Sequence, residues 1–224
     1  MRQKRFYVIA STVACALAMA FVDGVIQPPY GMKSFLKVVL FLLVPLGYFG
    51  HFRAWDSLKA LFLLNKRELA VALALGIGAF GVITGGYMVI SRFFSLEEAI
   101  WQMTAEGGVN PGNFLYVSFY IALVNSLLEE FFFRGYAFLN MKRLTSRGFA
   151  YFFSATLFAV YHLGMVSGNG NPLIWGAALV LLTAAGLILN ALNERSGSIL
   201  TSWLLHMCAN LGINAVGFYV FGMI

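Results

Sequence analysis

The most constraining feature of this sequence is a series of long apolar stretches with short polar segments between them. Most approach the roughly 20 residues that a helix needs to cross a bilayer. They leave no room for a separate soluble domain, so we predict an all-α polytopic transmembrane helix bundle that forms a single integral membrane domain over residues 1–224. The seven predicted spans are 6–26, 35–50, 69–91, 113–138, 149–166, 173–192 and 199–221.

The composition agrees with this assignment. Hydrophobic residues make up 60% of the chain and charged residues only 11%, whereas an average soluble domain is about 45–50% apolar and about 25% charged. A soluble enzyme of this length is therefore excluded. The net charge of +6 comes from basic residues grouped between apolar stretches, which is typical of loops that face anionic lipid. We expect membrane lipid, and no nucleic acid, as a partner.

Two segments between the spans have an amphipathic pattern. Trp55, Leu58 and Phe62 fall on one helical face of the segment 51–68, and its basic residues lie elsewhere. The segment 93–103 combines acidic and aromatic side chains. Both segments are predicted to be helices that lie in the membrane interface.

The distribution of basic residues predicts the orientation. Alternate loops carry only Lys33, Lys37 and Arg92, and the other ends of the spans carry most of the lysines and arginines. Since basic loops stay on the cytoplasmic side, we expect a multi-pass protein of the cell membrane with a cytoplasmic N-terminus and an exterior C-terminus. The residues at the predicted cytoplasmic ends are Arg2, Lys4, Arg5, Arg53, Lys59, Lys66, Arg67, Lys142, Arg143, Arg147 and Arg195.

The span 113–138 contains two adjacent carboxylates, Glu129 and Glu130, followed by Arg134. Charged groups within a span cost roughly 2.5–3.5 kcal/mol each on insertion. Glu130 and Arg134 are four residues apart, so they can pair on one face, and this pair could have a purely structural role. Glu129 points about 100° away and is left to face a cavity, with Asn125 on the same face.

Two other spans carry polar groups at helical spacing. His162 follows Phe158 by four residues, and Asn210 follows His206 by four. A single histidine in a bundle can simply bond to a backbone carbonyl. Several buried polar groups lower stability unless they find partners, so we interpret this set as a functional site.

These residue types suit one reaction. A carboxylate and a histidine can activate a water molecule as general bases. A second histidine and an amide can donate hydrogen bonds to a developing oxyanion. Neither the GxSxG motif of serine hydrolases nor the HExxH motif of zinc proteases occurs in the sequence. Together the residues predict water attack on an acyl group, most simply the hydrolysis of a peptide bond.

With these motifs the chain resembles the CPBP or Abi family, the CAAX prenyl protease 2-like glutamic intramembrane endopeptidases. The family motifs EExxxR, FxxxH and HxxxN lie within residues 129–210 and are matched by Glu129, Glu130, Arg134, Phe158, His162, His206 and Asn210.

The resemblance implies an endopeptidase without a cofactor that acts on a membrane-associated peptide or protein. It implies that Glu129 and His162 activate the water and that His206 and Asn210 form the oxyanion site. Glu130, Arg134 and Phe158 would be supporting residues. The short chain resembles bacterial members of the family, so a prenylated substrate is not assumed.

Two alternatives remain open. Glu129, His162 and His206 could instead bind a metal ion as three ligands, with an open position for water. The chain could also be a non-catalytic membrane immunity or scaffold protein with the same fold. The shared site has one geometric difficulty: the nominal depths of His162 and His206 in their helices differ by roughly 9 Å, so tilt or shifted helix boundaries must bring them together.

Overall fold

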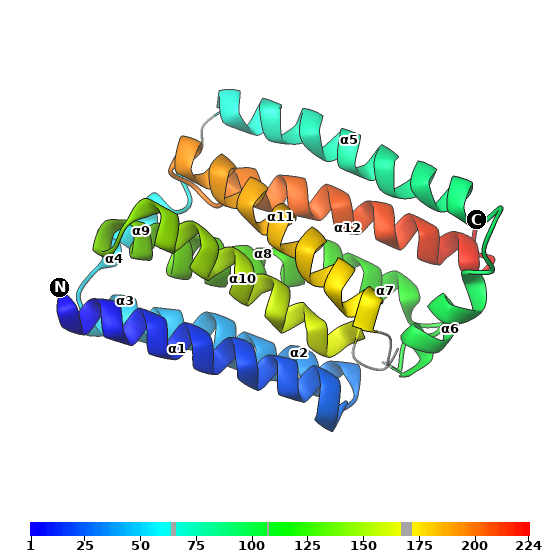
Figure 1. The fold of residues 1–224 in the computed structure, drawn as a ribbon, viewed down its shortest axis with the longest axis horizontal. Helices are drawn as coiled ribbons and strands as arrows, with labels where there is room; N and C mark the ends of the chain where they lie inside the picture. The colour runs from blue at the N-terminus through cyan, green and yellow to red at the C-terminus, as the bar shows by residue number, and fades with distance from the viewer. Residues whose placement is uncertain (64–65, 107, 167–171) are drawn as a thin grey trace.

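The computed structural model describes residues 1–63, 66–106, 108–166 and 172–224. These residues form helices and connecting turns without a strand, which confirms the predicted all-α class. The long helices lie side by side along a common direction, and the two termini lie at opposite ends of the bundle (Figure 1).

Several spans are built from successive helical segments. The first joins α1 (Arg2–Phe21) to η1 (Val22–Ile26), and η1 is a π-helix. The second joins α2 (Tyr30–Val38), η2 (Val39–Leu43) and α3 (Val44–His51). The longest joins α7 (Phe114–Phe119), η3 (Tyr120–Asn125), α8 (Ser126–Glu129), η4 (Glu130–Leu139) and α9 (Asn140–Leu144).

The remaining helices are α4 (Trp55–Ala60), α5 (Lys66–Ile90), α6 (Glu97–Glu106), α10 (Arg147–Val166), α11 (Pro172–Ser196) and α12 (Leu200–Val220). Within the predicted interfacial segment 51–68, the described residues include the last residue of α3, the six-residue helix α4 and the start of α5. The backbone leaves the helix at Arg53, which has a φ of +50°. The segment 93–103 overlaps α6.

Among the described residues, six helices are long and apolar enough to cross a membrane. They are Arg2–Ile26, Tyr30–His51, Lys66–Ile90, Phe114–Leu144, Trp175–Ser196 and Leu200–Val220. The predicted span 149–166 corresponds to α10, which is not among the six, although it runs along the bundle with the others (Figure 1).

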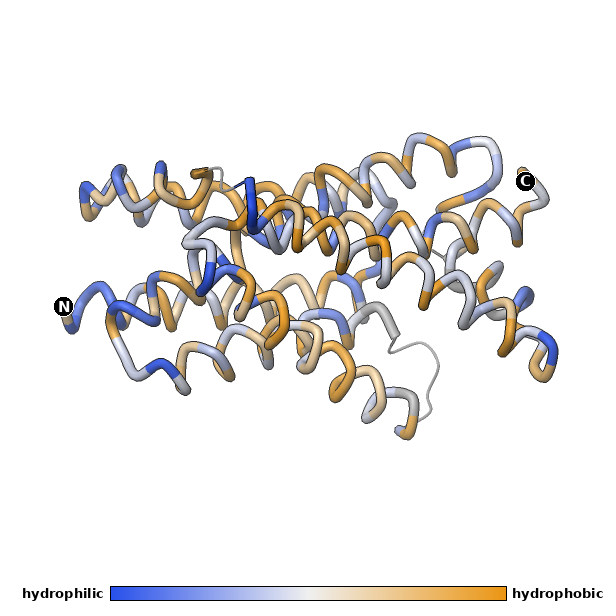
Figure 2. The backbone as a smooth tube through the Cα atoms, turned by 90° about the horizontal axis from the view of Figure 1, so that it is seen from above, coloured by the Kyte–Doolittle hydropathy of each residue, from blue (hydrophilic) through white to orange (hydrophobic). Residues whose placement is uncertain are grey.

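Polar residues gather at the ends of the helices, and hydrophobic residues follow their lengths (Figure 2). The N-terminus, α4, the start of α5 and α9 share one end of the bundle (Figure 1). The basic residues of these segments therefore lie together at that end, as the predicted topology requires.

The core of the bundle is rich in aromatic residues. Phe41, Phe132, Phe133 and Tyr161 are fully buried there. The rings of Phe41 and Phe132 are stacked with their centroids 4.2 Å apart. Phe132 and Phe133 place this aromatic core directly against the longest helix, within η4.

The start of α12 is held by two hydrogen bonds to the turn that contains Leu61. The backbone N–H of Ile199 donates to the carbonyl of Leu61 at 2.8 Å, and the Ser198 hydroxyl donates to the same carbonyl at 2.9 Å. Gly197 has a φ of +72°, a conformation that glycine adopts without steric cost. This turn before α12 fixes the depth of the helix that carries His206 and Asn210.

Candidate active site

Glu129 lies midway along the longest helix and faces a cavity of about 810 Å³. Only 1% of its side chain is exposed. Leu75, Leu182 and Leu205 contribute to an apolar part of the cavity wall, while Asp23 and Lys33 contribute polar groups. The Lys33 ammonium and the Asp23 carboxylate form an ion pair at 3.0 Å.

The two carboxylate oxygens of Glu129 have different surroundings. Oε1 accepts hydrogen bonds from Asn125 Nδ2 at 2.9 Å, from the Tyr161 hydroxyl at 3.0 Å and from Lys37 Nζ at 3.2 Å. Oε2 accepts no hydrogen bond from any described residue. One oxygen therefore anchors the carboxylate, and the other is left for chemistry.

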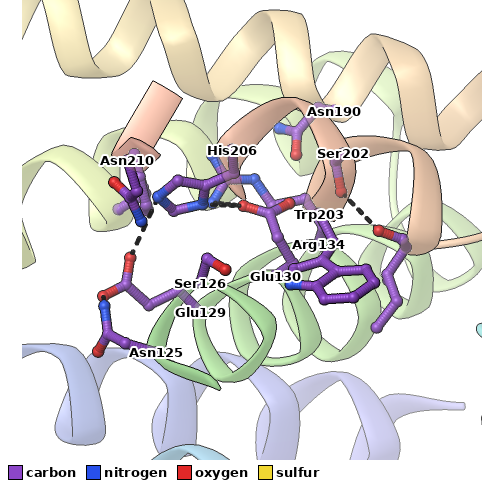
Figure 3. A network of polar contacts seen from close by, with 12 residues as sticks. Asn125, Ser126, Glu129, Glu130, Arg134, Asn190, Ser202, Trp203, His206 and Asn210 are labelled. Atoms are coloured by element: carbon purple, nitrogen blue, oxygen red, sulfur yellow. Dashed lines mark hydrogen bonds and ion pairs between the residues drawn. The ribbon is translucent and has the colours of Figure 1, made fainter. Parts of the chain in front are cut away.

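Both histidines approach the oxygen that is left without a donor. His162 Nε2 lies 3.6 Å from Glu129 Oε2, and His206 Nε2 lies 3.9 Å from it. The structure thus places the two histidines close together, although their nominal depths in the two helices differ. Glu129, His206 and Asn210 are seen converging from two helices in Figure 3.

The hydrogen bond of His162 defines what its other nitrogen can do. Nδ1 lies 2.8 Å from the carbonyl oxygen of Phe158, which can only accept, so Nδ1 carries the proton. In neutral His162, Nε2 is then an acceptor that faces Glu129 Oε2. The 3.6 Å between them is too long for a direct hydrogen bond, but a water molecule can donate to both atoms.

His206 connects the two carboxylates. Its Nδ1 lies 2.8 Å from Glu130 Oε1, and its Nε2 faces Glu129 (Figure 3). Since the Glu130 carboxylate accepts, Nδ1 of His206 is a donor, and an additional Nε2–H donor requires the imidazolium form.

The predicted Glu130–Arg134 pair is confirmed. Arg134 Nη1 lies 3.2 Å from Glu130 Oε1, and both side chains are completely buried. The guanidinium also lies 3.9 Å from the centroid of the Phe158 ring, a distance at which cation–π attraction operates. Glu130, Arg134 and Phe158 thus form a closed layer behind His206 and His162.

Asn210 lines the same cavity, one helical turn after His206. Its Nδ2 donates to the carbonyl of Ile121 at 3.2 Å, which holds the side chain against η3. All four residues predicted to be catalytic therefore line one cavity.

The topology prediction counted Lys37 among the basic residues of a loop, although the predicted span 35–50 includes it, and the loop assignment was wrong. Lys37 lies in α2, inside the span Tyr30–His51, and is only 5% exposed. Tyr161 was also missed as a contact of Glu129. The available signal for Lys37 was a charged residue inside an apolar stretch, which by default indicates a functional site.

The alternative metal-binding set gains no support from the described part of the chain. No group of three or more His, Cys, Asp or Glu residues there is arranged to hold a metal ion.

Comparisons with known proteins extend the family resemblance. Residues 111–212 match the family model Rce1-like, described as Type II CAAX prenyl endopeptidase Rce1-like. The match includes Glu129, His162, His206 and Asn210 and leaves residues 1–110 and 213–224 outside it. It confirms the resemblance that the motifs predicted and supports, at family level, an intramembrane protease of the CAAX type. No curated protein and no solved structure matches the chain significantly.

Proposed function

We propose that this protein is an intramembrane endopeptidase that hydrolyses a peptide bond with water activated by Glu129 and His162. The observation that carries the proposal is the geometry of Glu129. Its Oε1 is held by three donors, and its Oε2 faces His162 Nε2 at 3.6 Å inside the cavity. Two convergent acceptors of this kind are what a general-base site for water requires.

In the first step a water molecule donates one hydrogen bond to Glu129 Oε2 and one to His162 Nε2. As its oxygen bonds to the carbonyl carbon of the substrate, one of these acceptors takes up a proton. The carbonyl oxygen gains negative charge, and a tetrahedral intermediate forms.

The oxyanion is stabilised by donors on α12. The amide of Asn210 supplies an N–H, and His206 supplies Nε2–H when its ring is doubly protonated. Groups that interact more strongly with the oxyanion than with the neutral carbonyl lower the barrier. The intermediate then collapses, the carbon–nitrogen bond breaks, and the proton held by Glu129 or His162 passes to the departing amine.

The proposed substrate is a membrane-associated peptide or protein. An apolar wall with Leu75, Leu182 and Leu205 suits a chain segment or attached group with hydrophobic character, and the polar residues Asp23 and Gln27 suit a peptide at the membrane surface. Asp23 lies in η1 and Gln27 directly follows it, and the end of the first span lies at the bundle end remote from the N-terminus (Figure 1).

The proposed orientation follows from the basic end of the bundle. Basic segments remain in the cytoplasm, so the N-terminus is cytoplasmic, the C-terminus is exterior, and Gln27 marks an exterior end of the cavity. Single cysteines test this in a variant in which the buried Cys15 and Cys208 are alanine. An impermeant reagent on intact cells labels cysteine at exposed Ser95 and spares cysteine at exposed Ser146. The opposite labelling pattern reverses the orientation.

The activity is tested with purified protein and a library of internally quenched peptides in lipid nanodiscs. Glu129→Gln is expected to lower turnover by about 10²–10⁴-fold, the contribution of a general base. Because the change also removes the counter-charge of the buried Lys37, the folded fraction is measured alongside and turnover is expressed per folded molecule. A chelator such as 1,10-phenanthroline is the matched control and leaves turnover unchanged. Near-normal turnover of Glu129→Gln would disprove the role of Glu129, and loss of turnover with the chelator would favour the metal-dependent alternative.

A further inference from the structure

Lys37 is a buried cation that lies outside the part of the chain matched by the family model. It is located on α2 and lines the cavity next to Glu129. Its side chain is 6% exposed. Burial of an ammonium group is costly unless charge and hydrogen bonds compensate it, so the partners of Lys37 explain why it is there.

Those partners surround the ammonium group closely. Nζ donates to Asn125 Oδ1 at 2.5 Å and to Glu129 Oε1 at 3.2 Å. It also lies 5.1 Å from the centroid of the Tyr161 ring. Asn125 and Tyr161 each donate to the same Glu129 oxygen. Lys37 is thus the charged member of a three-donor group on Oε1.

We propose that Lys37 is a positioning residue for the proposed hydrolysis, because it fixes Oε1 of Glu129 and thereby keeps Oε2 directed at His162 and His206. The inference rests on the proposed function, since it concerns the orientation of the proposed general base. Lys37 acts through Glu129 and needs no contact with the substrate.

The geometry explains why a cation serves this purpose. Rotation about the last side-chain bond of Glu129 turns the plane of its carboxylate, and a partial rotation directs both oxygens away from the water. A positive charge and two neutral donors on one side make the observed orientation strongly preferred. If Lys37 is removed, Lys33, which already pairs with Asp23, does not replace it, and the carboxylate gains freedom to turn away from the water.

The test uses the full-length protein with Cys15→Ala and Cys208→Ala, to which Lys37→Cys is added. We expect kcat to fall about 10²-fold, the loss that a displacement of about 1 Å can cause, while KM changes little. Treatment with 2-bromoethylamine converts the cysteine into a lysine analogue with an ammonium group at the same reach and is expected to restore most of kcat. Treatment with 1-iodopropane, which adds similar volume without charge, is not expected to do so.

Lys142 is a matched control because its Nζ also lies 3.2 Å from a carboxylate oxygen, that of Glu194, away from the cavity. Lys142→Cys is expected to keep kcat before and after either treatment. If Lys37→Cys does not fold, Lys37→Gln, which retains a neutral donor, replaces it, with a partial loss of kcat expected.

Three results would overturn the inference: unchanged kcat, a change in KM alone, or equal rescue by the neutral propyl group. Glu129→Gln in the same assay separates this inference from the proposed function. If Glu129→Gln is inactive and Lys37→Cys is normal, only the role of Lys37 is wrong. If Glu129→Gln remains active, the proposed function itself is wrong.

Discussion

Glu129 and Glu130 are neighbours in the chain, but they belong to two different regions of the bundle. Glu130 is completely buried with Arg134, whose guanidinium lies over the ring of Phe158 in the aromatic core. Glu129 faces the cavity, and one of its oxygens has no donor among the described residues. The 100° that separates consecutive helical residues is enough to place one carboxylate in a packed region and the other in a hollow one.

Under the proposed function, this difference gives two roles to one motif. The pairing of Glu130 with Arg134 neutralises a charge in the packed region and positions His206 through Nδ1. The donors on Oε1 of Glu129 leave Oε2 available. The environment, rather than the residue type, therefore distinguishes the supporting carboxylate from the proposed base.

Among the variants that test the difference between the two carboxylates, Glu130→Gln is expected to have the largest effect. This change leaves the buried Arg134 without a counter-charge, and loss of one partner of a buried ion pair costs about 3–5 kcal/mol. The free energy of unfolding in mixed micelles measures the loss, and the double variant Glu130→Gln with Arg134→Met should recover much of it. A fully stable Glu130→Gln would show that the pair is not structural.

A slightly smaller effect is expected at Asn210, on the cavity side. Asn210→Ala removes one proposed oxyanion donor, which typically costs about 10²–10³-fold in turnover, or roughly 2.7–4 kcal/mol. Steady-state kinetics should show the loss in kcat with little change in KM. A change confined to KM would instead make Asn210 a residue that binds the substrate.

The smallest effect is expected from an ion pair at the surface. Arg147 Nη2 lies 2.7 Å from Glu194 Oε2, closer than the two groups of the buried pair, but 71% of the Arg147 side chain is exposed. Solvent screens such pairs, so Arg147→Met should change the unfolding midpoint far less than Glu130→Gln. Equal losses for the two variants would contradict the view that burial sets the importance of the pair.

Much of this arrangement is present in the sequence. The lengths of the apolar stretches predict most of the spans, and the spacing of Glu130 and Arg134 predicts their pairing, because both features depend on one helix at a time. The spacing of His206 and Asn210 likewise places both on the cavity side of α12.

Other features depend on how helices meet. The approach of His162 and His206 to one oxygen depends on where α10 and α12 begin and how they are tilted, and neither follows from periodicity. Lys37 contacts Glu129 from a helix far away in the sequence, so only the tertiary structure shows its partner.

The turn before α12 has a consequence for the lipid environment. Leu61 accepts hydrogen bonds from both Ile199 and Ser198, so the level of α12 is set by another part of the protein and not by the bilayer. A membrane thicker or thinner than the bundle is accommodated by tilt or by deformation of the lipid. We therefore expect the bundle to tilt as one body, with the distance between Glu129 and His206 kept in membranes of different thickness.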